Sequence, residues 1–320
     1  ARQEALHTSL ARVLRTNDLE NGRKVCFGLR SLGLDVRGTK AFELFPFNSE
    51  PVVADYLEYR RVTAFVNDLG PSVLQHLDAD DRVRATYDPV GAATGRVSTR
   101  SPNVMGLPRT MRHFVQARPG HVFVDADYSA IELRIIAAKT KDPRLMQAFH
   151  EGLDVHRMTA ALITGKAYDE ITNEERHRAK PVNFGWVFGM SINGFIRNAI
   201  ESYGITFTRD EATEIRARYF GAYAGIVEWH EMLRRHLDRK VVLATAGRAR
   251  RVPAATENDR MLPFRILANS PVQGTAANGM KRALGLLARR LPAYDAHIVA
   301  TVHDQVLVEV KEELAHEVKD

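Results

Sequence analysis

The stretch that decides the fold is HVFVDADYSAIELR, His121–Arg134. Its first residues predict a strand that runs into two aspartates, Asp125 and Asp127. Because side chains alternate across a strand, Phe123 lies on the same face as both aspartates. A helical pattern begins at about Ser129, so the strand delivers a carboxylate at its carboxyl end. For this segment alone, an aspartate that caps the helix explains the pattern equally well.

A second stretch, IVATVHDQVLVEV, supplies another aspartate at the end of an apolar strand. It predicts a hairpin whose polar tip is His303, Asp304 and Gln305, although turns favour Asp for local hydrogen bonding as well. Two such aspartates suit magnesium, which prefers hard oxygen ligands. A pair of ions about 3.5 to 4 Å apart stabilises the attacking and the leaving oxygen of a phosphoryl displacement. Asp127 and Asp304 therefore predict phosphoryl transfer with two Mg²⁺ ions.

A third stretch, ERHRAKPVNFGWVFG, predicts a helix with a functional face. Arg176, Lys180, Phe184 and Phe188 recur every four residues and lie on one side of it. Cations near the amino-terminal end of a helix favour binding of a triphosphate, and the aromatic rings that follow suit a base or a sugar. The alternative is a solvated start followed by core aromatics.

Composition agrees with a nucleic-acid partner without requiring one. The 320 residues are 45% hydrophobic, with a formal charge of +6 and a pI near 9.5. Arg248, Arg250 and Arg251 form one basic cluster, for which a solvated face remains the alternative. No apolar run of about 18 residues predicts a membrane span, and we expect a cytoplasmic setting, bacterial or viral in an infected cell, with an organelle left open. The single Cys26 predicts a buried small hydrophobe.

The order of patterns along the chain predicts an α+β protein. Residues 1–80 read as helical, 83–124 as short strands between turns, and 129–237 as helical again. The last part is expected to return to strands. Strand segments then bracket a large helical insertion.

The three stretches together resemble the three motifs of family A DNA polymerases. DADYSAIELR resembles the first motif, RHRAKPVNFGWVFGMS the second and ATVHDQVLVEV the third, in the family's order. ATGRVSTRSPN, GLDVHRMTAA, TAGRARRVP and ANSPVQGTAANGMKRA add to the resemblance, which covers about residues 55–310.

The resemblance implies a right-hand fold with a mostly antiparallel palm sheet, helical fingers and a short helical thumb. The implied thumb is residues 1–80, the palm is 81–143 and 244–320, and the fingers are 144–243. It also implies a DNA polymerase that adds dNTPs to the primer of a primer-template DNA, without a proofreading domain in this chain. A nuclease domain or replication partners outside the chain stay open.

The resemblance also assigns roles residue by residue. Asp127, Asp304 and the carbonyl of Tyr128 would hold the metals, and Lys180 would protonate the departing pyrophosphate. The triphosphate would be held by three cations, which are Lys180, Arg176 and His156. Phe184 and Glu132 would lie at the incoming sugar, where Glu132 would exclude ribose, and Phe188 would lie beside Glu132. His303 and Gln305 would contact the substrate beside Asp304. The residues implied on the minor groove and template side are Arg96, Arg265, Asn269 and Gln273.

Three positions depart from the family pattern. Gln305 stands where the family usually carries Glu, which removes a charge beside the metals. Phe188 replaces a tyrosine whose hydroxyl would steady Glu132, so we expect a more mobile carboxylate there unless water or another side chain replaces that hydrogen bond. Pro181 lies inside the expected helix, where it removes an amide and would clash with the carbonyl of His177.

Two other functions remain as alternatives. A single-subunit RNA polymerase would use a similar aspartate pair and basic helix, but Glu132 and the large Phe184 favour deoxynucleotides. A catalytically idle DNA-binding remnant would suit the basic charge equally well. Retention of Asp127, Asp304 and Lys180 favours an active enzyme.

Overall fold

The computed structural model describes residues 1–107, 109–257 and 259–319, which form two compact units. Unit 1 comprises residues 1–84 and 191–213, and unit 2 comprises residues 85–190 and 214–320. Unit 1 therefore holds the expected thumb and part of the segment expected as fingers. In none of the described ranges is a helix long and apolar enough to cross a membrane.

Unit 1 is helical, as its sequence predicts. Its helices are α1 (Arg2–Leu14), α2 (Gly22–Ser31), α3 (Ala41–Leu44), α4 (Pro51–Leu69) and α9 (Ile192–Tyr203), and α10 (Arg209–Ala222) begins in it and continues into unit 2. Leu6, Leu10 and Leu14 recur at helical spacing on α1 and are buried against α2 and α4. Cys26 is buried in the same core, as predicted.

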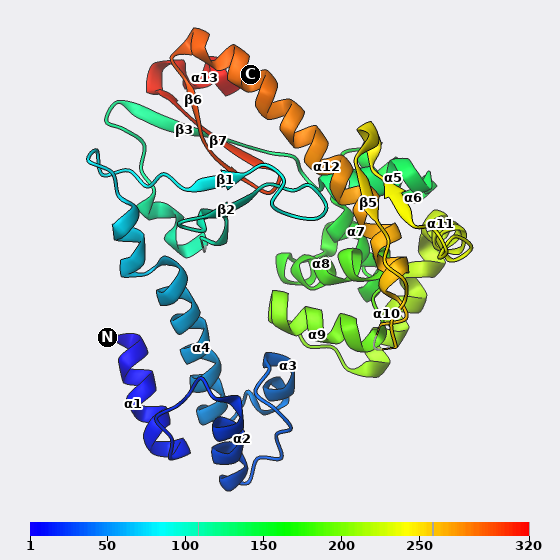
Figure 1. The fold of residues 1–320 in the computed structure, drawn as a ribbon. Helices are drawn as coiled ribbons and strands as arrows, with labels where there is room; N and C mark the ends of the chain where they lie inside the picture. The colour runs from blue at the N-terminus through cyan, green and yellow to red at the C-terminus, as the bar shows by residue number, and fades with distance from the viewer. Residues whose placement is uncertain (108, 258, 320) are drawn as a thin grey trace. The chain divides into compact units, whose positions relative to one another are not determined.

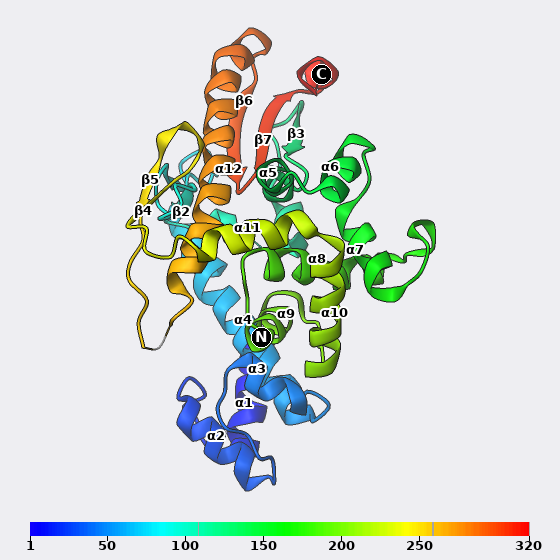
Figure 2. The same ribbon diagram turned by 90° about the vertical axis from the view of Figure 1, so that its right-hand side faces the viewer.

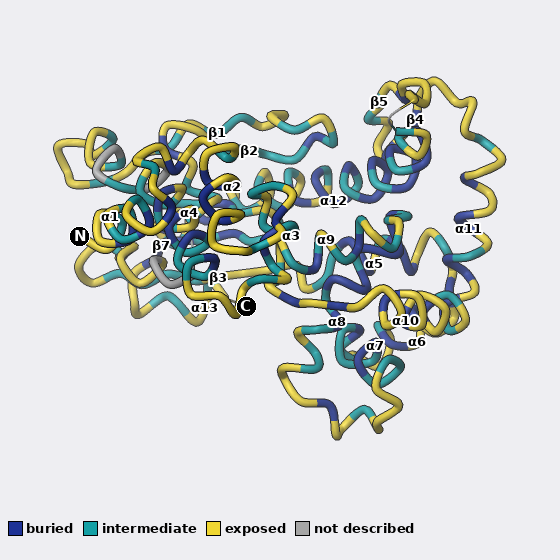
Figure 3. Tube along the Cα trace, turned by 90° about the horizontal axis from the view of Figure 1, so that it is seen from below, coloured by how far each residue is buried: buried dark blue, intermediate teal, exposed yellow. Residues whose placement is uncertain are grey.

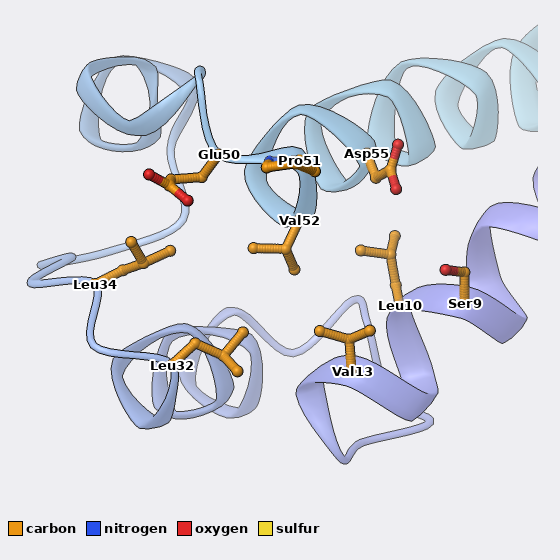
Figure 4. A pocket seen from close by; sticks show the side chains of 9 residues that line it. All are labelled: Ser9, Leu10, Val13, Leu32, Leu34, Glu50, Pro51, Val52 and Asp55. Carbon is orange, nitrogen blue, oxygen red and sulfur yellow. The ribbon is translucent and has the colours of Figure 1, made fainter.

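A pocket in unit 1 lies between α1, the segment after α2 and the start of α4 (Figure 4). Its lining is mostly apolar, with Glu50 and Asp55 as its two carboxylates. None of the predicted site residues lines it.

Unit 2 contains all of the described strands and every predicted site residue. Its elements are β1 (Thr86–Asp88), β2 (Ser98–Arg100), β3 (His121–Asp127), α5 (Ile131–Thr140), α6 (Pro143–His150), α7 (Val155–Thr164), α8 (Asn173–Val187), α11 (Ala224–Arg234), β4 (Val241–Leu243), β5 (Ala249–Arg251), α12 (Leu262–Arg290), β6 (His297–Val302), β7 (Gln305–Lys311) and α13 (Ala315–Lys319). The mixture of helices with antiparallel strands confirms the α+β prediction.

The central sheet of unit 2 has the order β3-β7-β6 and is antiparallel throughout (Figure 1). Val306, Val308 and Val310 point to a core that also contains Met280 of α12 and residues of α13. Strand alternation puts Asp125, Asp127 and Gln305 on the opposite face. The aspartates therefore lie on the face that the core leaves uncovered.

The main departure from the sequence expectation is α12, a helix of 29 residues in a region expected to return to strands (Figures 1 and 2). Pro271 lies inside it, and Gly274 and Gly279 further weaken the helical pattern. Tertiary burial compensates for this weak propensity, because most residues from Pro263 to Ala277 are buried (Figure 3). Similarly, α8 continues as a helix through Pro181.

Candidate active site

Asp127 and Asp304 occupy neighbouring positions at one end of the central sheet. Asp127 ends β3 and pairs in register with Gln305, the first residue of β7. The amide of Tyr128 donates to the carbonyl of Asp304 at 3.1 Å, which joins β3 to the turn before β7. Asp127 is exposed and Asp304 half-buried. Backbone pairing thus brings the two predicted metal ligands to one edge.

The donor set at this edge fits magnesium. Among the residues that the structure describes, no group of three or more His, Cys, Asp or Glu side chains is arranged to hold a metal. Two carboxylates are nevertheless sufficient, because Mg²⁺ is usually bound by one or two of them together with substrate phosphates and water. The carbonyl of Tyr128 accepts from the amide of Ile131 at 3.1 Å and has a second lone pair for a further contact.

Gln305 makes a specific contact with a third carboxylate at this edge. Its amide nitrogen lies 2.7 and 2.6 Å from the two carboxylate oxygens of Asp125. Its carbonyl oxygen accepts from Arg112 at 3.4 Å. A glutamate could not donate this bond and would place like charges side by side, so the neutral residue at 305 is matched to Asp125. We call Asp125, Asp127, Asp304 and Gln305 the carboxylate edge.

Glu132 forms an ion pair with Arg96. The carboxylate of Glu132 is buried, and a guanidinium nitrogen of Arg96 donates to it. Burial lowers the pKa of Arg96, and the charge of Asp304 opposes that shift. Arg96 therefore supplies the replacement partner that Phe188 cannot provide, which is the condition under which a mobile Glu132 is not expected.

The turn that carries Arg96 is fixed to α12 by basic side chains. Lys281 donates to the carbonyl of Gly95 at 2.7 Å, and Arg248 packs directly against Gly95. The φ of Gly95 is +83°, and any side chain there would collide with the guanidinium of Arg248. Arg250 donates to Ser270 of α12 at 2.7 Å. These cations therefore have structural contacts of their own.

The residues expected on the template side share one stripe of α12. Arg265, Asn269 and Gln273 are spaced by four and are half-buried, whereas Ile266–Ala268 and Ser270–Val272 beside them are buried. Arg265 forms an ion pair with Asp259. The helix thus presents all three side chains together.

Arg176 of α8 is joined to the start of α7 through Asp154. One carboxylate oxygen of Asp154 accepts from the backbone amides of His156 and Arg157, which caps α7. The other accepts from Arg176 at 2.6 and 2.7 Å. Burial would raise the pKa of Asp154, but the hydrogen bond from Arg176 and the other contacts bring it below its ordinary value.

His156 lies in the same group, with its ring centroid 5.8 Å from that of Phe184. Its Nδ1 is 3.0 Å from the amide nitrogen of the fully buried Asn183. Burial lowers the pKa of His156 to about 4, opposed by Asp154 and reinforced by the charges of Arg176 and Lys180. We call Asp154, His156, Arg176, Lys180 and Asn183 the cation cluster.

The end of α8 is fixed by packing that requires glycine. Gly189 has a φ of +74°, and a side chain there would meet the ring of Phe264. His230 donates from Nε2 to the carbonyl of Val187 at 2.7 Å and packs edge-on against Phe264. Phe188, between these contacts, is buried.

The family follows from a comparison with known proteins. The model of DNA polymerase family A matches residues 35–320. This chain belongs to DNA polymerase family A. It is 38% identical over 267 residues to DNA polymerase I of Aquifex aeolicus, covering 82% of this chain and 45% of that protein. It is 33% identical over 284 residues to DNA polymerase I of Pseudomonas aeruginosa, covering 85% of this chain and 30% of that protein. The chain thus spans less than half the length of these bacterial relatives.

The family fold is present throughout the chain. A structure of the POL domain of Pol1 from M. smegmatis, in complex with a DNA primer-template and dNTP, matches with a TM-score of 0.83 at 24% sequence identity. The match covers 99% of this chain and 61% of that one. The predicted right-hand polymerase fold is confirmed by this similarity.

Within this polymerase fold, sequence reasoning missed the residues that orient the predicted ones. Asp154 and Asn183 were given no role, although each lies within three residues of a predicted site residue. Asp154 carries a usable signal, since an aspartate directly before a helix is a typical cap. Asn183 carries none, because its role depends on contacts across two helices.

Proposed function

We propose that this chain catalyses template-directed addition of dNTPs to the 3′ end of a DNA primer. The observation that carries the proposal is the pairing of β3 with β7, which brings Asp127 and Asp304 to one edge. The M. smegmatis domain with the same fold was solved with primer-template DNA and dNTP, which supports the same partners for this chain. On this basis residues 1–80 serve as thumb, 81–143 and 244–320 as palm, and 144–243 as fingers.

Asp127, Asp304 and the carbonyl of Tyr128 would hold two Mg²⁺ ions. When bound, such a pair stabilises the attacking and the leaving oxygen of an in-line phosphoryl displacement. His303 and Gln305 flank Asp304 and would contact the substrate there.

The cation cluster would bind the triphosphate of the incoming nucleotide. Arg176 is held by Asp154, so its guanidinium is oriented before the nucleotide arrives. Lys180 would donate a proton to the departing pyrophosphate. Phe184, one turn further along α8, would contact the sugar.

The residues around Glu132 would select the correct sugar and the correct base pair. Glu132 would occupy the space of a ribose 2′-hydroxyl and so exclude ribonucleotides. Arg96 and the stripe of Arg265, Asn269 and Gln273 would contact the minor groove, where acceptor positions are similar for all correct pairs.

Primer extension in the presence of Mg²⁺ tests this function, with dNTPs and NTPs compared on the same primed template. We expect dNTP incorporation that falls at least about a thousandfold in Asp127→Ala or Asp304→Ala, since two-metal stabilisation contributes several kcal/mol. Asp169→Ala, an exposed change outside the site, is the matched control. Preferential NTP use would identify an RNA polymerase, and DNA binding without extension would identify an idle remnant.

A further inference from the structure

A chain of buried polar side chains ends on His156. It runs from Tyr223, at the start of α11, through Thr159 of α7 to Asn183 of α8. The hydroxyl oxygens of Tyr223 and Thr159 are 3.2 Å apart, and Thr159 donates to the side-chain oxygen of Asn183 at 2.9 Å. All three are fully buried, so no solvent competes for these bonds.

The donor-to-acceptor direction of these hydrogen bonds is set by a backbone carbonyl. The side-chain nitrogen of Asn183 lies 3.4 Å from the carbonyl of Ala179, which can only accept. This fixes the nitrogen of Asn183 on that side and its oxygen toward Thr159. Thr159 then uses its single hydrogen on Asn183 and accepts from Tyr223, whose pKa is raised by burial, so that its hydroxyl stays protonated.

The second N–H of Asn183 points to Nδ1 of His156 at 3.0 Å. A donor facing Nδ1 requires a lone pair there, so the hydrogen of the neutral ring lies on Nε2. A protonated ring would place two donors face to face. Reversing the amide would instead place its oxygen against the carbonyl of Ala179.

Charges around His156 act in both directions. Asp154 on the same helix favours the charged ring, whereas Arg176 and Lys180 of α8 disfavour it. Burial adds to the effect of the two cations, and the pKa is about 4. This favours a neutral His156 at physiological pH, in contrast to the positive charge that the sequence resemblance implied.

We propose that Asn183 is a positioning residue that holds His156 as a neutral imidazole with its hydrogen on Nε2, so that His156 offers the nucleotide triphosphate an uncharged donor. Arg176 and Lys180 then carry the positive charge of the cluster. The assignment of the triphosphate as the acceptor rests on the proposed function, whereas the state of the ring does not.

The state of the ring can be observed directly in the free protein. Nitrogen-15 NMR of histidine-labelled protein, with the His156 signal assigned by its loss in His156→Gln, reports the tautomer between pH 5 and 8. We expect a neutral ring with hydrogen on Nε2 across this range. Hydrogen on Nδ1, or a charged ring at pH 7, overturns the proposal, and the wild-type spectrum needs no variant to fold.

Asn183→Asp tests whether Asn183 keeps the His156 ring neutral. A carboxylate accepts from Nδ1 instead of donating to it, so the pKa of His156 should rise from about 4 to above its ordinary 6.5. Asn173→Asp makes the same chemical change at an exposed position of α8 and should leave the pKa of His156 unchanged. An equal response in both variants, or in neither, contradicts the role of Asn183.

The function of the donor is tested by dNTP kinetics. His156→Phe keeps a ring but removes the donor, and should raise KM for dNTP by about threefold to tenfold with a smaller change in kcat. His156→Gln keeps a neutral donor and should recover much of that loss. Equal KM values for the two variants contradict an uncharged donor to the nucleotide. Absence of extension in the wild type, with the expected NMR spectrum, would refute the proposed polymerase activity and leave the ring assignment intact.

Discussion

The carboxylate edge and the cation cluster lie in the same unit but are built differently. At the carboxylate edge, backbone pairing sets the positions, and the charged groups are exposed or half-buried. In the cation cluster, side-chain hydrogen bonds set the orientation, with the half-buried Asp154 and the fully buried Asn183 each bonded to more than one partner. The comparison indicates that the cation cluster is preorganised, whereas the charge of the carboxylate edge would be offset by the Mg²⁺ ions proposed above.

Within the cation cluster, the largest effect is expected from Lys180. If it acts as the acid, Lys180→Ala should lower kcat by about 10²- to 10⁴-fold, because a positioned proton donor contributes about that much. Arg176→Ala should act mainly on KM for dNTP, since a group that is already oriented binds the ground state. Single-turnover and steady-state kinetics separate the two constants.

Lys139→Ala, an exposed change on α5, is the matched control for loss of a positive charge. Asp154→Asn should resemble Arg176→Ala more weakly, because it weakens the ion pair but keeps the guanidinium. Equal effects of Lys180→Ala and Arg176→Ala on both constants would contradict the division of roles.

A smaller effect is expected at the carboxylate edge from Gln305→Glu. This change removes the donor to Asp125 and places two carboxylates together, so the free energy of unfolding should fall by about 1 kcal/mol in the absence of metal. Urea unfolding in a chelator measures this loss. In the Asp125→Asn background, where the new amide can donate to the carboxylate introduced at position 305, the same change should cost little.

The cycle of the two changes gives the coupling between positions 125 and 305. Additive losses would mean that the contact of Gln305 with Asp125 contributes nothing. Adding Mg²⁺ should reduce the loss in Gln305→Glu if both carboxylates lie near the bound cations, and this separates an electrostatic cause from a packing cause.

The contrast between the carboxylate edge and the cation cluster also explains which features the sequence could predict. Asp127 and Asp304 were predictable because strand alternation and a short turn act over a few residues, and the sheet register then joins them. The long helix α12 was not predictable from periodicity, since Pro271 and its glycines hide a helix that burial stabilises. Local patterns thus predicted the two aspartates at the strand ends but not the long helix α12.

The partners of predicted residues were equally hidden. Arg96 and Glu132 were expected to contact different parts of the substrate, whereas the structure joins them in an ion pair next to the turn at Gly95, which accepts a hydrogen bond from Lys281 of α12. Asn183 lies beside Phe184 in sequence, yet its side chain bonds to His156 and Thr159 of α7, and Thr159 in turn bonds to Tyr223. Such contacts follow from helix packing, which no single-segment pattern encodes.

The smallest effect is expected on sugar selectivity. It distinguishes Arg96 from a tyrosine at position 188 as the partner of Glu132. Phe188 cannot donate a hydrogen bond, whereas Arg96 already forms an ion pair with Glu132. A tyrosine hydroxyl at position 188 would therefore add to an existing contact rather than create the first one. We expect Phe188→Tyr to raise selectivity for dNTP over NTP by no more than about threefold, less than a new bond to an isolated carboxylate would give.

The double-mutant cycle decides whether Arg96 is responsible. Glu132→Ala should abolish most of the selectivity, and Phe188→Tyr should then have no effect, since tyrosine can act only by positioning that carboxylate. In the Arg96→Ala background Glu132 loses its partner, so Phe188→Tyr should now improve selectivity by more than it does in the wild type. If the gain is the same with and without Arg96, the ion pair does not hold Glu132 in the working enzyme. If the gain persists without Glu132, tyrosine acts on the sugar by another route, and selection by the carboxylate is wrong.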